Sequence, residues 1–389
     1  MFSGRIPWSL TENPLTAELA RKRSEGGEIL DLTLANPTEA GFTFDPHLPE
    51  AFARPEVLRY SPHPKGLAAA REAISRYYAD AGCTVSADAI HCTAGTSEAY
   101  SFLFKLLCDP ENSVLIPHPA YPLFEYLAAL DSVRLRPYKL RRSAQGLWRI
   151  DFGSLDDACS DRPRAVVVVN PSNPVGAYLD PDDLAHLRVF CERRNIALIV
   201  DEVFWDFPLA RNVLRSRTVE ENSILTFTLN GLSKLAGLPQ LKLGWIVSSG
   251  PERLVAQARS RLDLIADAFL SVGTPVMLAA DTLLTSRVSV QEEIRTRCIT
   301  NYAVLKELLS CFSSLHVPEV QGGWTAVINL PKDTDEEHFA MNLLRKQSVY
   351  VHPGYFFDFP RGVHAVVSLL TPPAMFAEGV KRIAVEVGE

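Results

Sequence analysis

Short apolar runs recur through the first part of this 389-residue chain, each followed by turn-forming residues and then by a stretch of helical character. Apolar residues are continuous within each run, which is typical of strands in a parallel sheet that is covered on both faces. The predicted strands are residues 113–116, 165–169, 196–200, 224–229 and 243–248, and the helices predicted between them include 96–107, 181–194 and 251–267. Because such sheets bind ligands beyond the carboxyl ends of their strands, the residues that follow each run are the candidates for chemistry.

The C-terminal part follows a different pattern and predicts a smaller α+β unit. Helices are expected over residues 291–311 and 335–347, with short strands at 316–320, 324–330, 349–352 and 366–370. Gly273 and Pro275 interrupt the helical pattern between the two parts. A hinge is therefore predicted near residues 271–275.

Composition narrows the class of protein without indicating an activity. Apolar residues make up 47% of the chain, and the net charge of −7 without any Lys/Arg-rich run argues against nucleic acid or an anionic membrane as a partner. No apolar stretch approaches the roughly 20 residues that cross a bilayer, and the N-terminus lacks the apolar core of a secretion signal, so we expect a cytoplasmic protein. The seven cysteines show no C-x-x-C spacing, and no H-E-x-x-H is present, so no metal site is predicted.

Five strand ends carry side chains that could bind one ligand: the end of a short run at residues 90–92 and the ends of the predicted strands 113–116, 165–169, 196–200 and 224–229. Small and hydroxyl residues at the start of a helix can bind an anion, and an aromatic ring can stack on a flat ligand. An amide can donate a hydrogen bond to a ligand oxygen, and a buried carboxylate requires a cationic partner. A desolvated lysine amine becomes a nucleophile. In chain order these residues are Gly95, Thr96 and Ser97, then Tyr121, Asn173, Asp201 and Lys234. Each alone is better explained by a helix cap, a core aromatic residue, a turn or a surface lysine. Together they match the requirements of pyridoxal 5′-phosphate (PLP): an amine, a carboxylate and a phosphate site.

Three longer motifs carry a resemblance to a known family. They are N-P-S-N-P-V-G at residues 170–176, D-E-V-F-W-D at 201–206 and S-K-L-A-G-L-P-Q-L-K-L-G-W at 233–245. With them, the chain resembles the fold-type I PLP-dependent aminotransferases of class I/II from residue 31 to about residue 385. The resemblance implies an α/β fold of the aspartate-aminotransferase type, with a mostly parallel, seven-stranded-type sheet. It also implies a large PLP-binding domain over residues 46–275 and a small domain formed by both chain ends, residues 1–45 and 276–389.

The same resemblance implies a role for each residue around the cofactor ring. Lys234 would bond to the cofactor aldehyde and later move the substrate proton. Asp201 would keep the ring nitrogen N1 protonated, Asn173 would donate to O3′, and Tyr121 would stack on the ring.

The phosphate of PLP would lie in a second group of residues, which the resemblance also implies. These are Gly95, Thr96, Ser97 and Ser233, together with Lys242. Tyr60 matches a tyrosine that reaches the phosphate of a partner subunit, which implies a homodimer.

At four positions the sequence departs from the family pattern. Phe204 replaces a tyrosine that donates to O3′, and Lys242 keeps the charge of an arginine without its fork of donors. Ala35 stands where the substrate loop often has glycine, and Val366 stands where an arginine normally pairs with the substrate carboxylate. Without that arginine the chain would be an atypical family member, because a bidentate charged contact is lost.

Candidate residues for substrate binding are Ala35, Trp324 and Arg361. Trp324 lies in a Gly-Gly-Trp stretch and could line an aromatic pocket, although core packing explains it equally well. Arg361 is near position 366 in sequence, and its alternative is a solvated loop arginine.

The predicted function is transfer of an amino group, by way of Lys234, between an amino acid or related amine and a 2-oxo acid. A PLP-dependent lyase or decarboxylase stays open as an alternative, because Val366 favours PLP chemistry other than transamination. A PLP-dependent transcription regulator fits poorly with an acidic chain, and a nicotinamide dehydrogenase fits poorly because no G-x-G-x-x-G follows a strand.

Overall fold

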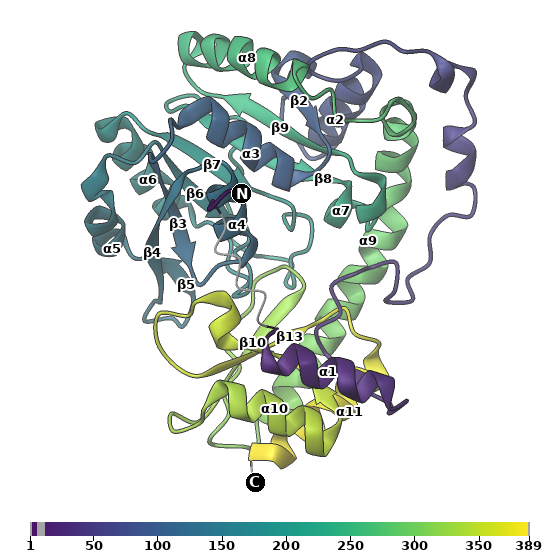
Figure 1. Ribbon diagram of the computed structural model, residues 1–389, viewed down its shortest axis with the longest axis vertical. Coiled ribbons are helices and arrows are strands. Elements are labelled where there is room, and N and C mark those ends of the chain that lie inside the picture. The colour runs from purple at the N-terminus through teal and green to yellow at the C-terminus, as the bar shows by residue number, and fades with distance from the viewer. Residues whose placement is uncertain (1, 6–11, 388–389) are drawn as a thin grey trace.

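The computed structural model describes residues 2–5 and 12–387, and one long helix, α9 (Thr274–Leu309), runs from its upper part to its lower part (Figure 1). The upper part holds an eight-stranded sheet in the order β2-β9-β8-β7-β6-β3-β4-β5. Its strands are β2 (Ile90–Thr93), β3 (Ser113–His118), β4 (Arg134–Arg142), β5 (Trp148–Ile150), β6 (Ala165–Val169), β7 (Ala197–Asp201), β8 (Thr226–Gly231) and β9 (Gly244–Ser249). The strands from β8 to β4 run parallel, whereas β9, β2 and β5 pair antiparallel.

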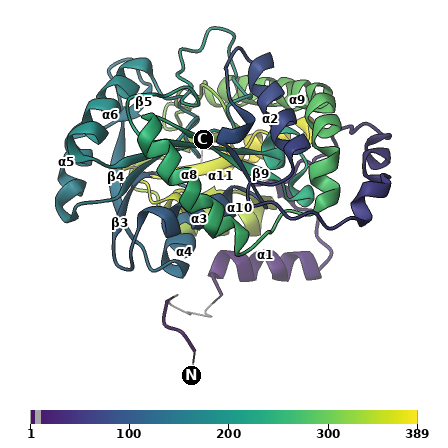
Figure 2. The ribbon, with the colours of Figure 1, turned by 90° about the horizontal axis from the view of Figure 1, so that it is seen from above.

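The central strands are apolar throughout because helices cover both faces of the sheet. In β6, Val167 packs in one buried cluster while Val166 and Val168 pack in another. Helices α3 (Thr96–Leu107), α4 (Leu123–Leu130) and α8 (Glu252–Asp267) contribute to the first cluster, and α5 (Phe152–Asp157) and α6 (Pro181–Arg194) contribute to the second. Figure 2 shows these helices around the sheet from above. Helix α2 (Ala68–Asp80) packs against α9, and the short helix α7 (Leu232–Leu235) directly follows β8.

The lower part is built from segments near both ends of the chain. Strand β1 (Leu30–Asp31) pairs in parallel with β11 (Val349–Tyr350). A second small sheet has the order β10-β13-β12, with β10 (Thr325–Asn329), β12 (His352–Pro353) and β13 (His364–Ser368). Helices α1 (Pro14–Ser24), α10 (Glu336–Gln347) and α11 (Pro373–Val387) lie beside these sheets in Figure 1. The domain limits at residues 45/46 and 275/276 stay a prediction.

Two predicted features of the C-terminal part differ from the structure. The helix expected at 291–311 is the second half of α9, which already begins at Thr274 with Gly273 as its N-cap. Pro275 fits there because the first turn of a helix leaves its N–H groups unbonded, so proline does not interrupt it. The strand expected at 316–320 is reduced to a single bridge between His316 and Asn329. None of the helices in the described ranges is both long and apolar enough to cross a membrane.

Candidate active site

The parallel strands bring the predicted lysine and carboxylate to one edge of the sheet. Asp201 ends β7 and pairs with Leu229 of β8, and Lys234 follows β8 within α7. Burial lowers the pKa of Lys234, and the negative charge of Asp201 partly opposes this shift. A lysine with a lowered pKa holds more of its neutral amine near neutral pH, which is the form that attacks a carbonyl.

Asp201 is buried and receives one hydrogen bond at each carboxylate oxygen. The backbone N–H of Val203 donates to Oδ1 over 3.1 Å, and the hydroxyl of Tyr100 donates to Oδ2, also over 3.1 Å. Burial raises the pKa of Asp201 to about 6, against the lowering by these two donors and by Lys234. A buried carboxylate of this kind fits a cationic partner such as a protonated ring nitrogen. Tyr100 was missed by the sequence reasoning, because nothing in its local sequence indicates a contact with Asp201.

Four of the five predicted phosphate residues lie at or near the start of α3. Gly95 is its N-cap with φ of +144°, a conformation that favours glycine, and Thr96 and Ser97 form the first turn. A Cβ placed on Gly95 would lie 3.7 Å from Nζ of Lys242, so this lysine reaches the same place. Ser233 stands beside Lys234 on α7. Free N–H groups at a helix start, hydroxyl groups and an ammonium group together suit a phosphate.

Tyr121 and Asn173 follow β3 and β6 at the same edge of the sheet. Tyr121 is 50% exposed, which leaves a ring face available to a ligand. Asn173 is half-buried, and the hydroxyl of Thr325 lies 3.5 Å from its Oδ1 and 2.9 Å from the carbonyl oxygen of Pro174. In the part of the chain that the structure describes, the amide nitrogen of Asn173 has no hydrogen-bond partner and can donate to a ligand oxygen. A lysine, a buried carboxylate, a phosphate cradle and a flat ring therefore fit PLP.

Comparison with known proteins identifies the family. The pattern of the family described as aminotransferase class I and II matches residues 36–383. The chain belongs to this family. It is 25% identical to glutamate-pyruvate aminotransferase of Haemophilus influenzae, over 95% of this chain and 93% of that one. Its fold is similar to alanine aminotransferase of Pyrococcus furiosus (TM-score 0.89, 22% identity, 99% of each chain) and to aspartate aminotransferase of Thermotoga maritima (TM-score 0.84, 20% identity, 100% of each chain).

The predicted fold class, the aminotransferase activity and the PLP dependence are thereby confirmed. Both solved structures are of the alanine or aspartate aminotransferase type, and they share the α/β sheet with a smaller second part. The match supports aminotransfer rather than the lyase or decarboxylase alternative.

In this aminotransferase, two aromatic side chains lie next to Lys234. Nζ of Lys234 lies 5.1 Å from the ring centre of Trp324 and 5.7 Å from that of Phe204. Trp324 also packs edge-on against Phe204 at 5.3 Å and against Phe207 at 5.0 Å. Trp324 is therefore a core residue, 3% exposed, whose ring also lies near the lysine, and its role in substrate binding stays a prediction.

Ala35 lies in a segment that is tied to the lysine loop. The preceding residue, Leu34, accepts a hydrogen bond from the hydroxyl of Ser368. Pro37 lies 3.3 Å from the Cβ position of Gly237, shortly after Lys234 in the chain. The segment around Ala35 therefore reaches the same region as Lys234.

Tyr60 and Arg361 are not brought to Lys234. Tyr60 is 80% exposed and lines a groove with Leu270 and Ser271. Arg361 is exposed, and its carbonyl oxygen lies 2.9 Å from Nε2 of His364. Within the described residues, no contact joins the side chain of Arg361 to Lys234, Asp201 or Asn173, so its role in substrate binding stays a prediction.

Proposed function

We propose that Lys234 and Asp201 carry the aminotransfer chemistry of this chain, Lys234 bonded to the cofactor aldehyde and Asp201 paired with the ring nitrogen. The observation that supports this is the half-buried lysine beside a buried carboxylate at neighbouring strand ends. The lowered pKa of Lys234 suits both its attack on the aldehyde and its later uptake of the substrate proton. Bound PLP supplies the electron sink for that proton transfer.

The remaining predicted residues complete this proposal. Asn173 donates to O3′ and the exposed ring of Tyr121 covers the cofactor ring. The phosphate is held by the start of α3 and by two side chains: Gly95, Thr96, Ser97, Ser233 and Lys242. In this arrangement Lys234 is the only one of these groups that must gain and lose a proton during turnover.

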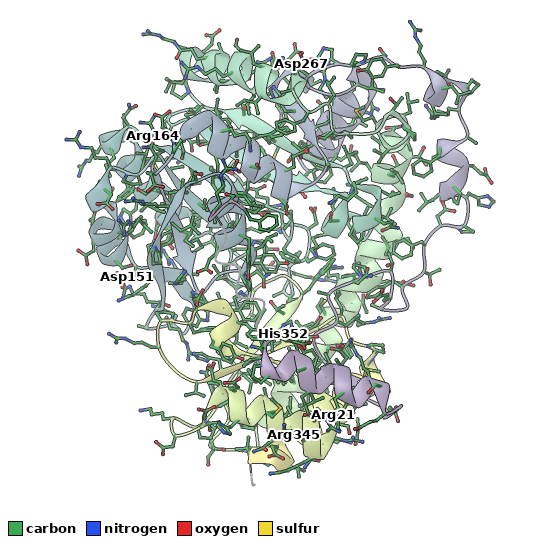
Figure 3. The ribbon with its side chains drawn as sticks, in the orientation of Figure 1. Arg21, Asp151, Arg164, Asp267, Arg345 and His352 are labelled. Atoms are coloured by element: carbon green, nitrogen blue, oxygen red, sulfur yellow. The ribbon has the colours of Figure 1, made fainter. Side chains whose placement is uncertain are left out.

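The substrate carboxylate is held without an arginine at position 366. Val366 is 2% exposed and packs in a cluster with Val327 and Phe357, which also contains Val175 of the loop that carries Asn173. In β13 it lies opposite Val327 on one side and His352 on the other. His352 lies where the lower part meets the upper part in Figure 3. Aliphatic and aromatic side chains therefore surround position 366, where the guanidinium of an arginine would otherwise lie, and we infer that the substrate site is atypical for the family.

The aromatic side chains next to Lys234 favour an amino donor with an uncharged side chain. Trp324 and Phe204 are both buried and apolar, and their ring centres lie 5.1 Å and 5.7 Å from Nζ of Lys234. Burial of apolar surface against them contributes about 25 cal/mol per Å², whereas a side-chain carboxylate beside these rings would lack a charged partner. The acceptor is a 2-oxo acid, as aminotransfer requires.

L-leucine and L-aspartate make a matched test, because their side chains share a branched shape and differ in charge. Each is mixed in excess with the PLP-loaded protein, and the loss of the absorbance band of bound PLP gives the rate of the first half-reaction. L-leucine is expected to react at least about tenfold faster, since desolvating a carboxylate costs more than 1.4 kcal/mol. Faster reaction with L-aspartate overturns the substrate proposal. The Lys234→Ala variant should give no half-reaction with either, and a half-reaction in that variant overturns the role of Lys234.

A homodimer belongs to the same proposal, with Tyr60 of each chain at the phosphate of the other. Leu58 is 91% exposed, Tyr60 80% and Phe269 54%, so large apolar side chains stand on the surface around the groove of Tyr60 and Leu270. A second copy of the chain would cover them, and apolar surface of this extent is typical of interfaces. In its own chain Tyr60 is exposed and lines a groove with Leu270 and Ser271, so we infer that the phosphate it contacts is that of a partner.

Hybrid dimers test this arrangement. One chain carries Tyr60→Phe and the other carries Lys234→Ala, so the only site with a lysine receives an intact tyrosine from its partner. The hybrid should bind PLP at that site as tightly as wild type, while the Tyr60→Phe homodimer binds it more weakly. Weak binding in both, or sedimentation of the wild-type protein as a monomer, contradicts the proposal. Tyr126→Phe serves as a control, since Tyr126 is also exposed, at 53%.

A further inference from the structure

Helix α3 presents a tyrosine to the carboxylate at the centre of the site. Tyr100 is 3% exposed, and its hydroxyl lies 3.1 Å from Oδ2 of Asp201, a residue 101 positions later in the chain. Its ring packs edge-on against Phe124 at 5.1 Å and 89°, and it packs at a tilt of 40° against Phe104 at 6.1 Å. Since both neighbours are themselves buried, the ring has little freedom to turn its hydroxyl elsewhere.

The hydroxyl of Tyr100 is a permanent donor. Burial and the nearby charge of Asp201 raise the pKa of Tyr100 well above its usual value, so the phenol stays protonated throughout the working pH range. Asp201 has one donor at each oxygen, Val203 N–H at Oδ1 and Tyr100 at Oδ2. Two donors from different elements fix the plane of the carboxylate and leave its other lone pairs free for a ligand.

These donors also act on the charge of Asp201. Burial alone favours the neutral carboxylic acid, and hydrogen bonds to the charged form favour the carboxylate. The hydroxyl of Tyr100 and the backbone N–H of Val203 counter burial by hydrogen bonds, and within residues 2–5 and 12–387 the hydroxyl is the only side-chain group that does so. A neutral Asp201 would lose its attraction for a cationic ring nitrogen.

We propose that Tyr100 is a positioning residue for this aminotransferase, which holds the carboxylate of Asp201 in place and in its charged form, so that Asp201 can pair with the ring nitrogen of the cofactor. This rests on the proposed role of Asp201. Tyr100 itself touches neither substrate nor cofactor and acts through the carboxylate.

The variant Tyr100→Phe removes only the hydroxyl and keeps the ring packing against Phe124. A hydrogen bond to a charged group contributes enough to shift a pKa by roughly one to two units. Since the lost bond favoured the charged carboxylate, the acidic limb of kcat against pH should move to higher pH by about that amount. KM for the amino donor should change by less than about twofold, because Tyr100 does not contact it. PLP should also leave the variant roughly tenfold faster on dilution, followed by absorbance without any substrate.

Tyr138→Phe is the matched control. Tyr138 is also fully buried, and its hydroxyl donates over 2.8 Å to the carbonyl oxygen of Val167, away from Asp201. This variant should keep the wild-type pH profile and the wild-type rate of PLP release. Equal shifts in both variants would mean that loss of any buried hydroxyl disturbs the site, and the inference would be overturned.

Introducing Tyr100→Phe into an Asp201→Asn background separates this inference from the proposed function. If Tyr100 acts through the carboxylate, the second substitution should add no further change in pH profile or PLP release. A further change of the same size, or a wild-type profile in Tyr100→Phe alone, overturns the inference and leaves the role of Asp201 standing. If Asp201→Asn alone keeps the wild-type rate and PLP affinity, the proposed role of Asp201 itself fails.

Discussion

Lys242 allows the phosphate site to be tested quantitatively. Its side chain is exposed and lies near the start of α3, where the Cβ position of Gly95 is 3.7 Å from Nζ. Its ammonium makes no ion pair or hydrogen bond with any residue in the ranges that the structure describes. Lys242→Ala therefore leaves no protein group unpaired, and its effect on PLP binding measures the contact with the phosphate alone.

The expected size follows from the exposure of this lysine. A hydrogen bond to a charged group contributes about 1.5–3 kcal/mol, and solvent screening places an exposed lysine at the lower end. A loss of about 1.5 kcal/mol corresponds to a roughly tenfold rise in the dissociation constant of PLP. Lys242→Arg should keep or improve the affinity, since its fork of donors matches two phosphate oxygens.

The assay compares PLP with pyridoxal, which has the same ring and aldehyde and lacks the phosphate. Dissociation constants are measured for both by equilibrium dialysis, in wild type and in Lys242→Ala. Only the constant for PLP should rise in the variant. Lys332→Ala, which removes an exposed charge from the loop after β10, should change neither constant. Equal weakening of PLP and pyridoxal by Lys242→Ala, or no weakening of PLP, would refute the reasoning.

Two further predictions concern pH. In Phe204→Tyr, the new hydroxyl can donate to O3′ near Lys234, so the pH at which the absorbance of bound PLP changes should fall; an unchanged midpoint in a spectrophotometric titration counts against this. Hydrogen bonds from Arg21 and Arg345 lower the pKa of Glu18 from 4.5 to about 2, and these residues join α1 to α10 (Figure 3). Because the pKa of Glu18 is lowered in the folded chain, its carboxylate stabilises the fold above about pH 4.5, and this stabilisation is lost as the pH falls to about 2. Glu18→Gln should therefore lower the melting temperature at pH 7, and a difference that stays constant down to pH 2 contradicts the assignment.

Features that depend on neighbouring residues could be predicted from the sequence. Helices α3 and α6 begin and end at the predicted residues, and β6 coincides with the predicted run 165–169. An unbroken apolar run indicates a strand with both faces buried, and the turn after it must then lie at the edge of the sheet. Asp201 and Lys234 follow two such strands, so their common location was implied before any three-dimensional information.

Features that depend on contacts between distant segments could not be predicted in this way. The antiparallel pairing of β9 with β8 and β2 is set by the path of the chain, which apolar periodicity does not record. The contact between Tyr100 and Asp201, which lie 101 positions apart in the chain, is of the same kind.

Asp201 shows how a local pattern and a distant contact together determine one group. Sequence reasoning placed the carboxylate at the end of a buried strand and noted that Phe204, shortly after it, lacks a hydroxyl. Judged from these neighbouring residues alone, the site lacks the hydrogen-bond donor that a tyrosine at position 204 would supply. In the structure a donor comes from α3, where Tyr100 reaches Asp201 across the sheet edge. The two hydroxyl positions are not equivalent: a tyrosine at position 204 would act on O3′, whereas Tyr100 acts on the carboxylate that pairs with the ring nitrogen. Tyr100 therefore does not replace the donor that is absent at position 204, and a comparison restricted to the neighbours of Asp201 misses it because it lies on another helix.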